Sequence, residues 1–180
     1  MINGPAKANL TTASNPIFNQ IEDLTAQMFY NPSEPILGVK DEVVIAPNLR
    51  ALMERSSTIV TTLEDEDGLL EAFSMTIPLG EMDPRRAIET DTAYVYYIAV
   101  QPNLQGEGRV ASLMKAMESQ LKDQGYGYFE LDANISNGFA DKLEKAYGEA
   151  VVSKRNHAGY EGTGPQRALR VDLSKVPLAS

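Results

Sequence analysis

The chain has 180 residues, no cysteine and a single histidine, His157, which excludes disulfides and thiolate chemistry and argues against a multi-histidine metal site or a serine triad. Its 25 acidic residues outnumber 16 basic ones, and the net charge of −9 argues against a nucleic-acid or anionic-membrane partner and favours a cationic one. No apolar run approaches the ~20 residues that span a bilayer, and residues 1–10 lack a signal-peptide pattern. We therefore expect a cytoplasmic protein that folds as one domain over residues 1–180.

The first third of the chain predicts a short extended segment at residues 5–10 and then two helices. Asn15 can cap the first helix, and Pro16 fits its first turn, where the missing N–H of proline costs nothing. Apolar residues then recur at helical spacing, as Ile17, Ile21, Leu24 and Met28. We expect this helix to end in the proline-containing stretch 30–35, a loop to follow as far as Ala46, and a second helix to begin at Pro47.

Residues 57–100 predict three strands. The segment 57–80 has two β-rich runs around an acidic turn that closes on Gly68, which is the pattern of a β-hairpin. The acidic run 64–67 lacks the ligand spacing of a calcium loop, so we interpret it as part of the turn. A polar connection over 81–92 then leads to a third strand from Tyr94 to Val100.

The last part of the chain alternates helices and strands. After a glycine turn, a helix that ends at Gly125 carries one apolar stripe, formed by Val110, Leu113, Met114, Met117 and Leu121. A strand at 128–133, a helix from about Asn137 to Tyr147 and strand-like runs at 150–155 and 168–174 follow. The order β-α-α-β-β-β-α-β-α-β-β predicts an α/β (α+β) fold with a mixed central sheet flanked by helices.

The glycine turn QPNLQGEGRV, residues 101–110, has the features of an anion site. It joins a strand to a helix, so unpaired amides and the positive end of the helix dipole converge there. A P-loop would need a Gly-Lys-Ser/Thr ending, which the sequence after Gly108 lacks. A dinucleotide fingerprint is matched by Gly106, Gly108 and Ala111, with Asp132 about 20 residues on, but too little chain remains for a doubly wound sheet.

The stretch from Tyr97 to Tyr126 resembles the central signature of the GNAT superfamily of N-acetyltransferases, in which a strand, a Gln/Arg-x-x-Gly-x-Gly/Ala turn and a helix bind coenzyme A. Gln105 and Gly108 match the first two fixed positions. Val110 stands where the family prefers glycine or alanine, and we expect it to crowd the start of the helix. The segment from 137 to 148 is similar to the family's N-x-x-A-x-x-L-Y-x-x-x-G pattern through Asn137, Ala140, Leu143 and Gly148.

This resemblance implies a binding site for acetyl-CoA as cosubstrate, without a metal. The backbone of Ile98 and Val100 would contact the acetyl and pantetheine arm, and Asn137 would contact the pantetheine or adenosine side. Arg109 is the expected cation near the phosphates. The pyrophosphate would be held by amides of the glycine turn, namely those of Gln105, Gly106, Glu107, Gly108, Arg109, Val110 and Ala111.

The catalytic residues are less well defined by the resemblance, because Glu144 stands where the family has a tyrosine that protonates the leaving thiolate. Tyr147 lies three residues later on nearly the same helical face, and it fits both the role of acid and the apolar stripe. For the base we consider carboxylates of the connection before the central strand, and His157 as a minor alternative. Tyr96 and Tyr97 are candidates for lining the acetyl channel. The carboxylates are Glu81, Asp83, Glu89 and Asp91.

We therefore interpret the protein as an enzyme that transfers an acetyl group from acetyl-CoA to a primary amine. The amine is expected to attack the thioester directly, without a covalent enzyme intermediate. The acidic charge favours a cationic acceptor, either a small molecule or a protein amine. Two alternatives stay open: a non-catalytic module that binds coenzyme A or an acyl-CoA, and a structural or interaction protein that kept the architecture alone. The sequence does not decide whether the chain forms a homodimer.

Overall fold

The structure is a computed structural model that describes residues 16–29, 45–159 and 164–176. Two expected features, the extended segment at 5–10 and the loop over 30–44, lie outside these residues. The elements in chain order are α1 (Pro16–Phe29), α2 (Ile45–Met53), β1 (Ile59–Glu64), β2 (Leu70–Pro78), α3 (Leu79–Met82), η1 (Pro84–Arg86), β3 (Thr92–Val100), η2 (Pro102–Leu104), α4 (Arg109–Asp123), β4 (Tyr128–Asn134), α5 (Phe139–Tyr147), η3 (Gly148–Ala150), β5 (Val151–His157) and β6 (Gln166–Asp172).

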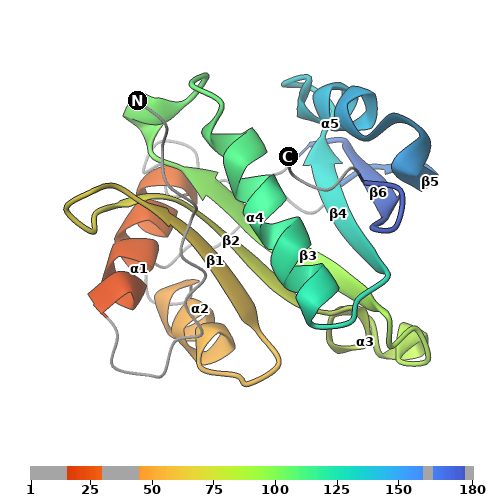
Figure 1. Ribbon diagram of the computed structural model, residues 1–180, viewed down its shortest axis with the longest axis horizontal. Coiled ribbons are helices and arrows are strands. Elements are labelled where there is room, and N and C mark those ends of the chain that lie inside the picture. Colours follow the sequence, from red (N-terminus) through yellow and green to blue (C-terminus); the bar gives the residue numbers. More distant parts are fainter. Residues whose placement is uncertain (1–15, 30–44, 160–163, 177–180) are drawn as a thin grey trace.

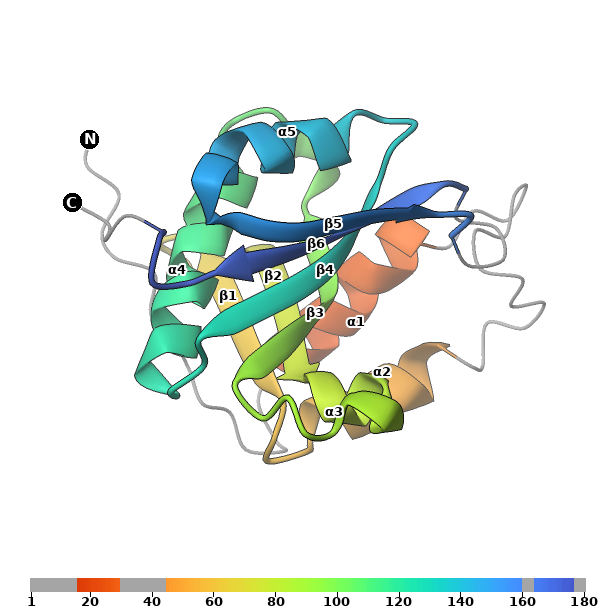
Figure 2. The ribbon, with the colours of Figure 1, turned by 90° about the vertical axis from the view of Figure 1, so that its right-hand side faces the viewer.

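The six strands form one mixed sheet in the order β1-β2-β3-β4-β6-β5 (Figures 1 and 2). β1 and β2 are the predicted hairpin, and every neighbouring pair is antiparallel except β3 and β4. Those two strands are parallel because α4 carries the chain back across the sheet between them. This arrangement confirms the mixed α/β sheet flanked by helices that the sequence predicts.

The parallel strands β3 and β4 pair over a short length and then part. Their register runs from Thr92 opposite Tyr128 to Val95 opposite Leu131. Beyond Val95, β3 continues to Val100 along β2, while β4 continues to Asn134 along β6. Figure 1 shows the two arrows diverging above this point. The divergence, which we call the fork, opens the sheet between the two strands.

Helices cover the two faces of the sheet (Figure 2). On one face α4 and α5 pack against β3, β4 and β6 through a buried cluster that includes Met117, Leu121, Phe129, Leu143 and Leu169. On the other face α1 and α2 pack against β2 and β3 through Ile21, Leu24, Leu49, Phe73 and Met75. These side chains follow the apolar stripes seen in the sequence. Among the described helices, none is long and apolar enough to cross a membrane.

Several boundaries differ from the predicted ones for local reasons. α2 begins at Ile45, so Pro47 lies in its first turn rather than at its start. α5 begins at Phe139 rather than Asn137, because the Asn137 side chain accepts a hydrogen bond from the Phe139 amide at 2.9 Å before the helix starts. The polar connection 81–92 contains η1, whose start is capped by Asp83 through the Arg85 amide at 3.2 Å.

Candidate active site

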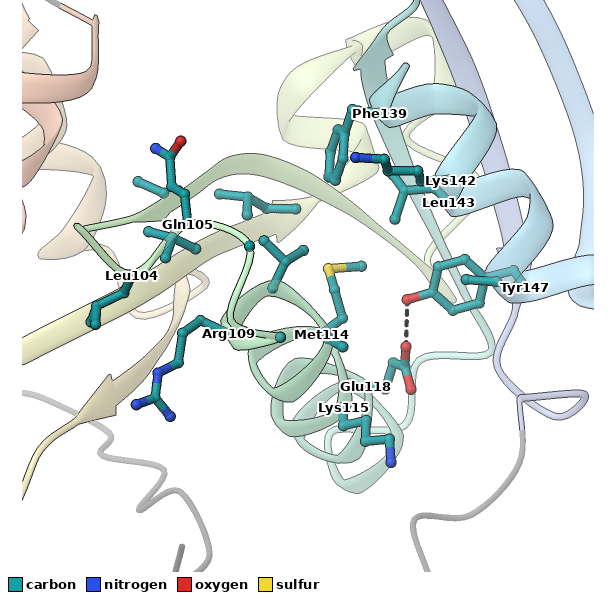
Figure 3. Close-up of a pocket in the computed structure, with 18 of the residues that line it drawn as sticks. Leu104, Gln105, Arg109, Met114, Lys115, Glu118, Phe139, Lys142, Leu143 and Tyr147 are labelled. Atoms are coloured by element: carbon teal, nitrogen blue, oxygen red, sulfur yellow. Dashed lines mark hydrogen bonds between the residues drawn. The ribbon is translucent and has the colours of Figure 1, made fainter. Parts of the chain in front are cut away.

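A cavity of about 830 Å³ opens beside the fork, between the end of β3, the start of α4 and the inner face of α5 (Figure 3). It combines an apolar wall with a few polar groups, the usual character of a small-molecule site. Eight of the ten residues expected to bind the cosubstrate line it, whereas Glu107 and Asn137 do not. The eight are Ile98, Val100, Gln105, Gly106, Gly108, Arg109, Val110 and Ala111.

The glycine turn supplies one end of the cavity. Gly106 and Gly108 have φ values of 89° and 80°, which side-chain-bearing residues rarely adopt. A Cβ atom at either position would meet nothing within 4 Å, so the space above the turn is open to a ligand. Gly108 caps α4 without a side-chain hydrogen bond, and the first amides of a helix have no intrahelical acceptor. The turn therefore presents backbone donors to an anion at the positive end of the helix dipole.

Val110 does not disturb the helix start as we expected. The helical bond from the Ser112 amide to the Gly108 carbonyl is 3.1 Å long. The Val110 side chain packs against the buried clusters around α4 and lines the cavity. The departure from glycine or alanine therefore adds apolar surface to the cavity floor.

The positive charges near the turn differ from those the sequence suggested. Arg109 forms an ion pair with Glu71 of β2 at 3.0 Å, and Figure 3 shows its guanidinium pointing away from the Tyr147 end of the cavity. Lys115 and Lys142, which were not among the residues predicted from the sequence, also line the cavity. Lys115 could have been found, because it lies one helical turn after Ala111 of the glycine turn.

Tyr147 and Glu118 form a hydrogen-bonded pair at the other end of the cavity (Figure 3). The Tyr147 hydroxyl donates to Glu118 Oε1 at 2.5 Å, and its ring packs edge-on against Phe129 at 5.5 Å between centroids. Tyr147 therefore lines the cavity and also packs with its ring in the core. Glu118 was missed, although it continues the row Val110, Met114, Glu118 at four-residue spacing, where a buried acid requires a partner.

The pKa values of both Tyr147 and Glu118 are raised. Burial raises the pKa of the Tyr147 phenol well above its ordinary value, and the charge and hydrogen bond of Glu118 raise it further. Burial also raises the pKa of Glu118, which is 7% exposed, and this outweighs the opposing effects of the Tyr147 hydrogen bond and of two nearby lysines. Tyr147 therefore stays protonated at neutral pH.

Glu144 and Asp91 lie away from the cavity. Glu144 faces β5 and β6, where it pairs with Arg167 at 2.9 Å and with Lys154, and these contacts lower its pKa. Three residues leave Glu144 and Tyr147 only about 60° apart around the helix, and it is the contacts with Arg167 and Lys154 that direct Glu144 away from the cavity. Asp91 precedes the far end of β3, where its carbonyl accepts the Gly127 and Tyr128 amides. Seven residues of extended strand, about 23 Å, separate it from Ile98.

The remaining candidate bases also have partners outside the cavity. Glu89 accepts hydrogen bonds from Arg86 and Arg170, which lower its pKa to about 2. Glu81 pairs with Arg55 at 3.4 Å, and Asp83 pairs with Arg85 at 2.9 Å. The residues Tyr96, Tyr97 and His157 do not line the cavity either.

A cavity with backbone donors for an anion at one end and a buried phenol at the other fits a small anionic ligand. The sequence profile of the acetyltransferase (GNAT) family matches residues 20–148. The chain belongs to this family, and it is an acyltransferase of the kind that uses acetyl-CoA. The family and enzyme class predicted from the sequence are thereby confirmed.

Solved structures show the same fold at low sequence identity. An N-acetyltransferase from Staphylococcus aureus has a TM-score of 0.69 at 16% identity, covering 94% of this chain and 99% of its own. A chimera of the Vibrio cholerae spermidine N-acetyltransferase has a TM-score of 0.66 at 15% identity, covering 96% and 98%. An aminoglycoside 6'-N-acetyltransferase complexed with coenzyme A has a TM-score of 0.65 at 14% identity, covering all of both chains. No curated protein sequence matches the chain.

Proposed function

We propose that the protein transfers an acetyl group from acetyl-CoA to a primary amine by direct attack of the amine on the thioester. The observation that carries this proposal is the cavity itself, in which the open glycine turn and the Tyr147 hydroxyl face one space from opposite ends. Two solved structures of the same fold are described as amine acetyltransferases, one for spermidine and one for aminoglycosides.

The residues of the turn fit a pyrophosphate. The amides that follow Gly108, in the first turn of α4, would donate to it, with the helix dipole adding favourable charge. Lys142 would neutralise phosphate charge, because Arg109 is already paired with Glu71. The edge of β3 beyond the fork, which the β4 register does not reach, would bond the amides of the pantetheine arm as a neighbouring strand would.

The chemistry requires one bond to form and one to break. The neutral amine nitrogen bonds to the acetyl carbon and the carbon–sulfur bond breaks. The nitrogen, which then carries one proton more than an amide, releases it to water, and the departing thiolate takes up a proton from water to become the thiol of coenzyme A. We propose that Tyr147 turns its hydroxyl from Glu118 to the sulfur and donates a hydrogen bond to it. Because Tyr147 stays protonated, it always meets the thiolate as a donor. Replacement of Tyr147 with Phe is then expected to lower kcat about 100-fold.

Removal of the proton from the acceptor amine does not require a side chain of the protein as base. Among the described residues that line the cavity, Glu118 is the one carboxylate, and it already accepts the Tyr147 hydrogen bond. The other candidate carboxylates lie outside the cavity. We therefore propose that the amine loses its proton to water before it attacks.

The first test is calorimetric titration of coenzyme A and acetyl-CoA. Gly108→Trp fills the open space over the turn, and Gly125→Trp is the matched control, because Gly125 has a similar φ of 85° and open surroundings at the far end of α4. We expect micromolar binding by the wild type and by the control, and none by Gly108→Trp. No binding by the wild type would contradict the proposal. Binding without transfer to any amine would instead support a non-catalytic coenzyme A-binding module.

A further inference from the structure

The cations that line the cavity differ in whether an acid of the protein offsets their charge. Three basic residues line it, Arg109, Lys115 and Lys142. Arg109 is paired with Glu71 at 3.0 Å, and the charge of Lys115 is offset by Glu118, which lies one turn further along α4. Within the described part of the chain, Lys142 makes no ion pair. A phosphate in the cavity therefore meets one uncompensated cation and the neutral amides of the turn.

The ion pair of Arg109 and Glu71 lies at the start of α4, directly beside the turn. Arg109 is the first residue of the helix, so its amide is one of the donors available to a phosphate. The Arg109 side chain is 23% exposed and the Glu71 side chain 17%, so water and salt screen their attraction only in part. The guanidinium points away from the Tyr147 end of the cavity (Figure 3). A cation whose own amide belongs to the phosphate site is therefore bound to an acid of the protein.

Glu71 does not satisfy the guanidinium completely. The Nε atom of Arg109 is buried, and no described residue accepts a hydrogen bond from it. Burying an N–H group of a charged side chain without an acceptor costs free energy, so the pair is weaker than one in which every buried donor is bonded. A phosphate is a strong acceptor for a guanidinium. An anion bound at the turn would therefore compete with Glu71 for Arg109.

Glu71 is held in place by bonds that do not involve its carboxylate. The Gln101 amide donates to the Glu71 carbonyl at 2.8 Å, and the Gln101 side chain donates to the Leu70 carbonyl at 3.1 Å. The Leu70 amide donates to the side chain of Gln20 in α1 at 2.7 Å. These bonds hold the start of β2 against the turn whether or not residue 71 is charged. Replacement of Glu71 with Gln therefore changes the charge beside Arg109 and keeps the backbone around it.

We propose that Glu71 sets the affinity of the cavity for coenzyme A by withholding Arg109 from the phosphates. The Glu71 carboxylate neutralises the guanidinium and places a negative charge beside the turn, and both effects weaken the binding of an anion. The product, coenzyme A, carries the same phosphates as acetyl-CoA, so a weaker hold also favours product release. Glu71 is a positioning residue, because it acts through Arg109. The inference rests on the proposed function, since it concerns the phosphates of that cosubstrate.

The test is a double-mutant cycle in which coenzyme A is titrated by calorimetry into each variant. Glu71→Gln frees the guanidinium and should tighten the binding of coenzyme A about 10-fold, the gain of one charge-assisted hydrogen bond less the cost of ordering the side chain. Arg109→Gln leaves the Glu71 carboxylate without its cation beside the turn and should weaken binding about 10-fold. The double variant loses both charges and should bind within about 3-fold of the wild type.

The dependence of binding on ionic strength separates this role of Glu71 from a structural one. A freed guanidinium adds a second cation to the site, so the affinity of Glu71→Gln should fall more steeply than that of the wild type between about 0.05 and about 0.5 M salt. If the ion pair only anchored the turn, both single variants would weaken the binding of coenzyme A and the salt dependence would not steepen.

Glu81→Gln is the matched control, because it removes the acid of another ion pair, with Arg55 at 3.4 Å, and changes the net charge equally. It should bind coenzyme A as the wild type does. Thermal unfolding followed by circular dichroism establishes that each variant is folded. Binding by the wild type that is equal to or tighter than binding by Glu71→Gln would overturn the inference alone. Failure of the wild type and of all the variants to bind coenzyme A would contradict the proposed function, and the inference with it.

Discussion

The hydrogen bond between Tyr147 and Glu118 makes a pH-dependent contribution to stability that Tyr147→Phe isolates. The substitution keeps the ring contact with Phe129 and removes the donor to a carboxylate that is 7% exposed. A hydrogen bond to a buried charge is worth about 2 kcal/mol, and one to a neutral acid about 1 kcal/mol. We expect the variant to lose about 2 kcal/mol of unfolding free energy at about pH 7 and about 1 kcal/mol at about pH 4.

The sign follows from the pKa of Glu118. Burial raises that pKa above its ordinary 4.5, so the stability linked to its protonated form is present below pH 4.5 and is lost as pH rises through the raised value. The Tyr147 hydrogen bond opposes this shift, so the variant has a still higher pKa and loses more stability on the alkaline side. Urea unfolding followed by circular dichroism measures both losses. Tyr126→Phe, in the same apolar cluster, is the control. Equal losses at both pH values, or a loss matching that of Tyr126→Phe, would refute the reasoning.

Two further predictions concern the framework around the site. Glu89→Gln should lower the unfolding free energy by about 1 kcal/mol at neutral pH, a value reduced by solvent screening. This difference between variant and wild type should vanish as pH falls from 4.5 toward 2, because Arg86 and Arg170 hold the pKa of Glu89 at about 2. Urea unfolding across that range would show a constant difference if the ion pairs of Glu89 were unimportant. Gly80→Ala should lower Tm despite the higher helix propensity of alanine, because its Cβ would lie 2.7 Å from Ala87 Cα, whereas Gly127→Ala meets only an ordinary contact at 3.7 Å. Thermal unfolding with equal Tm values for the two variants would contradict that expectation.

Local patterns in the sequence were sufficient to predict most of the fold. The period of the apolar stripe located α4, alternating runs located the hairpin and β4, and glycines located the turn at 106–108. The fork and the bulge at Tyr96 were not predictable in this way, because both depend on how neighbouring strands pair. Register is a property of two segments, and a single run of residues does not contain it.

The same distinction between local and long-range features applies to the residues of the candidate site. The cavity lining from the glycine turn followed from one continuous motif, since its groups are adjacent in the chain. The pair of Glu118 and Tyr147 joins residues 29 positions apart on two helices, so nothing local connected them. Glu144 was suggested by its place in a motif, yet its position on α5 turns it toward Arg167 and Lys154. Ion pairs with residues of β5 and β6 decide the direction in which Glu144 points.

The measurement that tests the central claim most directly is a single turnover with acetyl-CoA and a mixture of primary amines, followed by mass spectrometry of both the protein and the small molecules. Direct attack predicts that acetylated amine appears together with free coenzyme A, while the protein keeps its unmodified mass throughout. An acetylated protein that forms before the product, or release of coenzyme A with free acetate and no acetylated amine, would contradict the account.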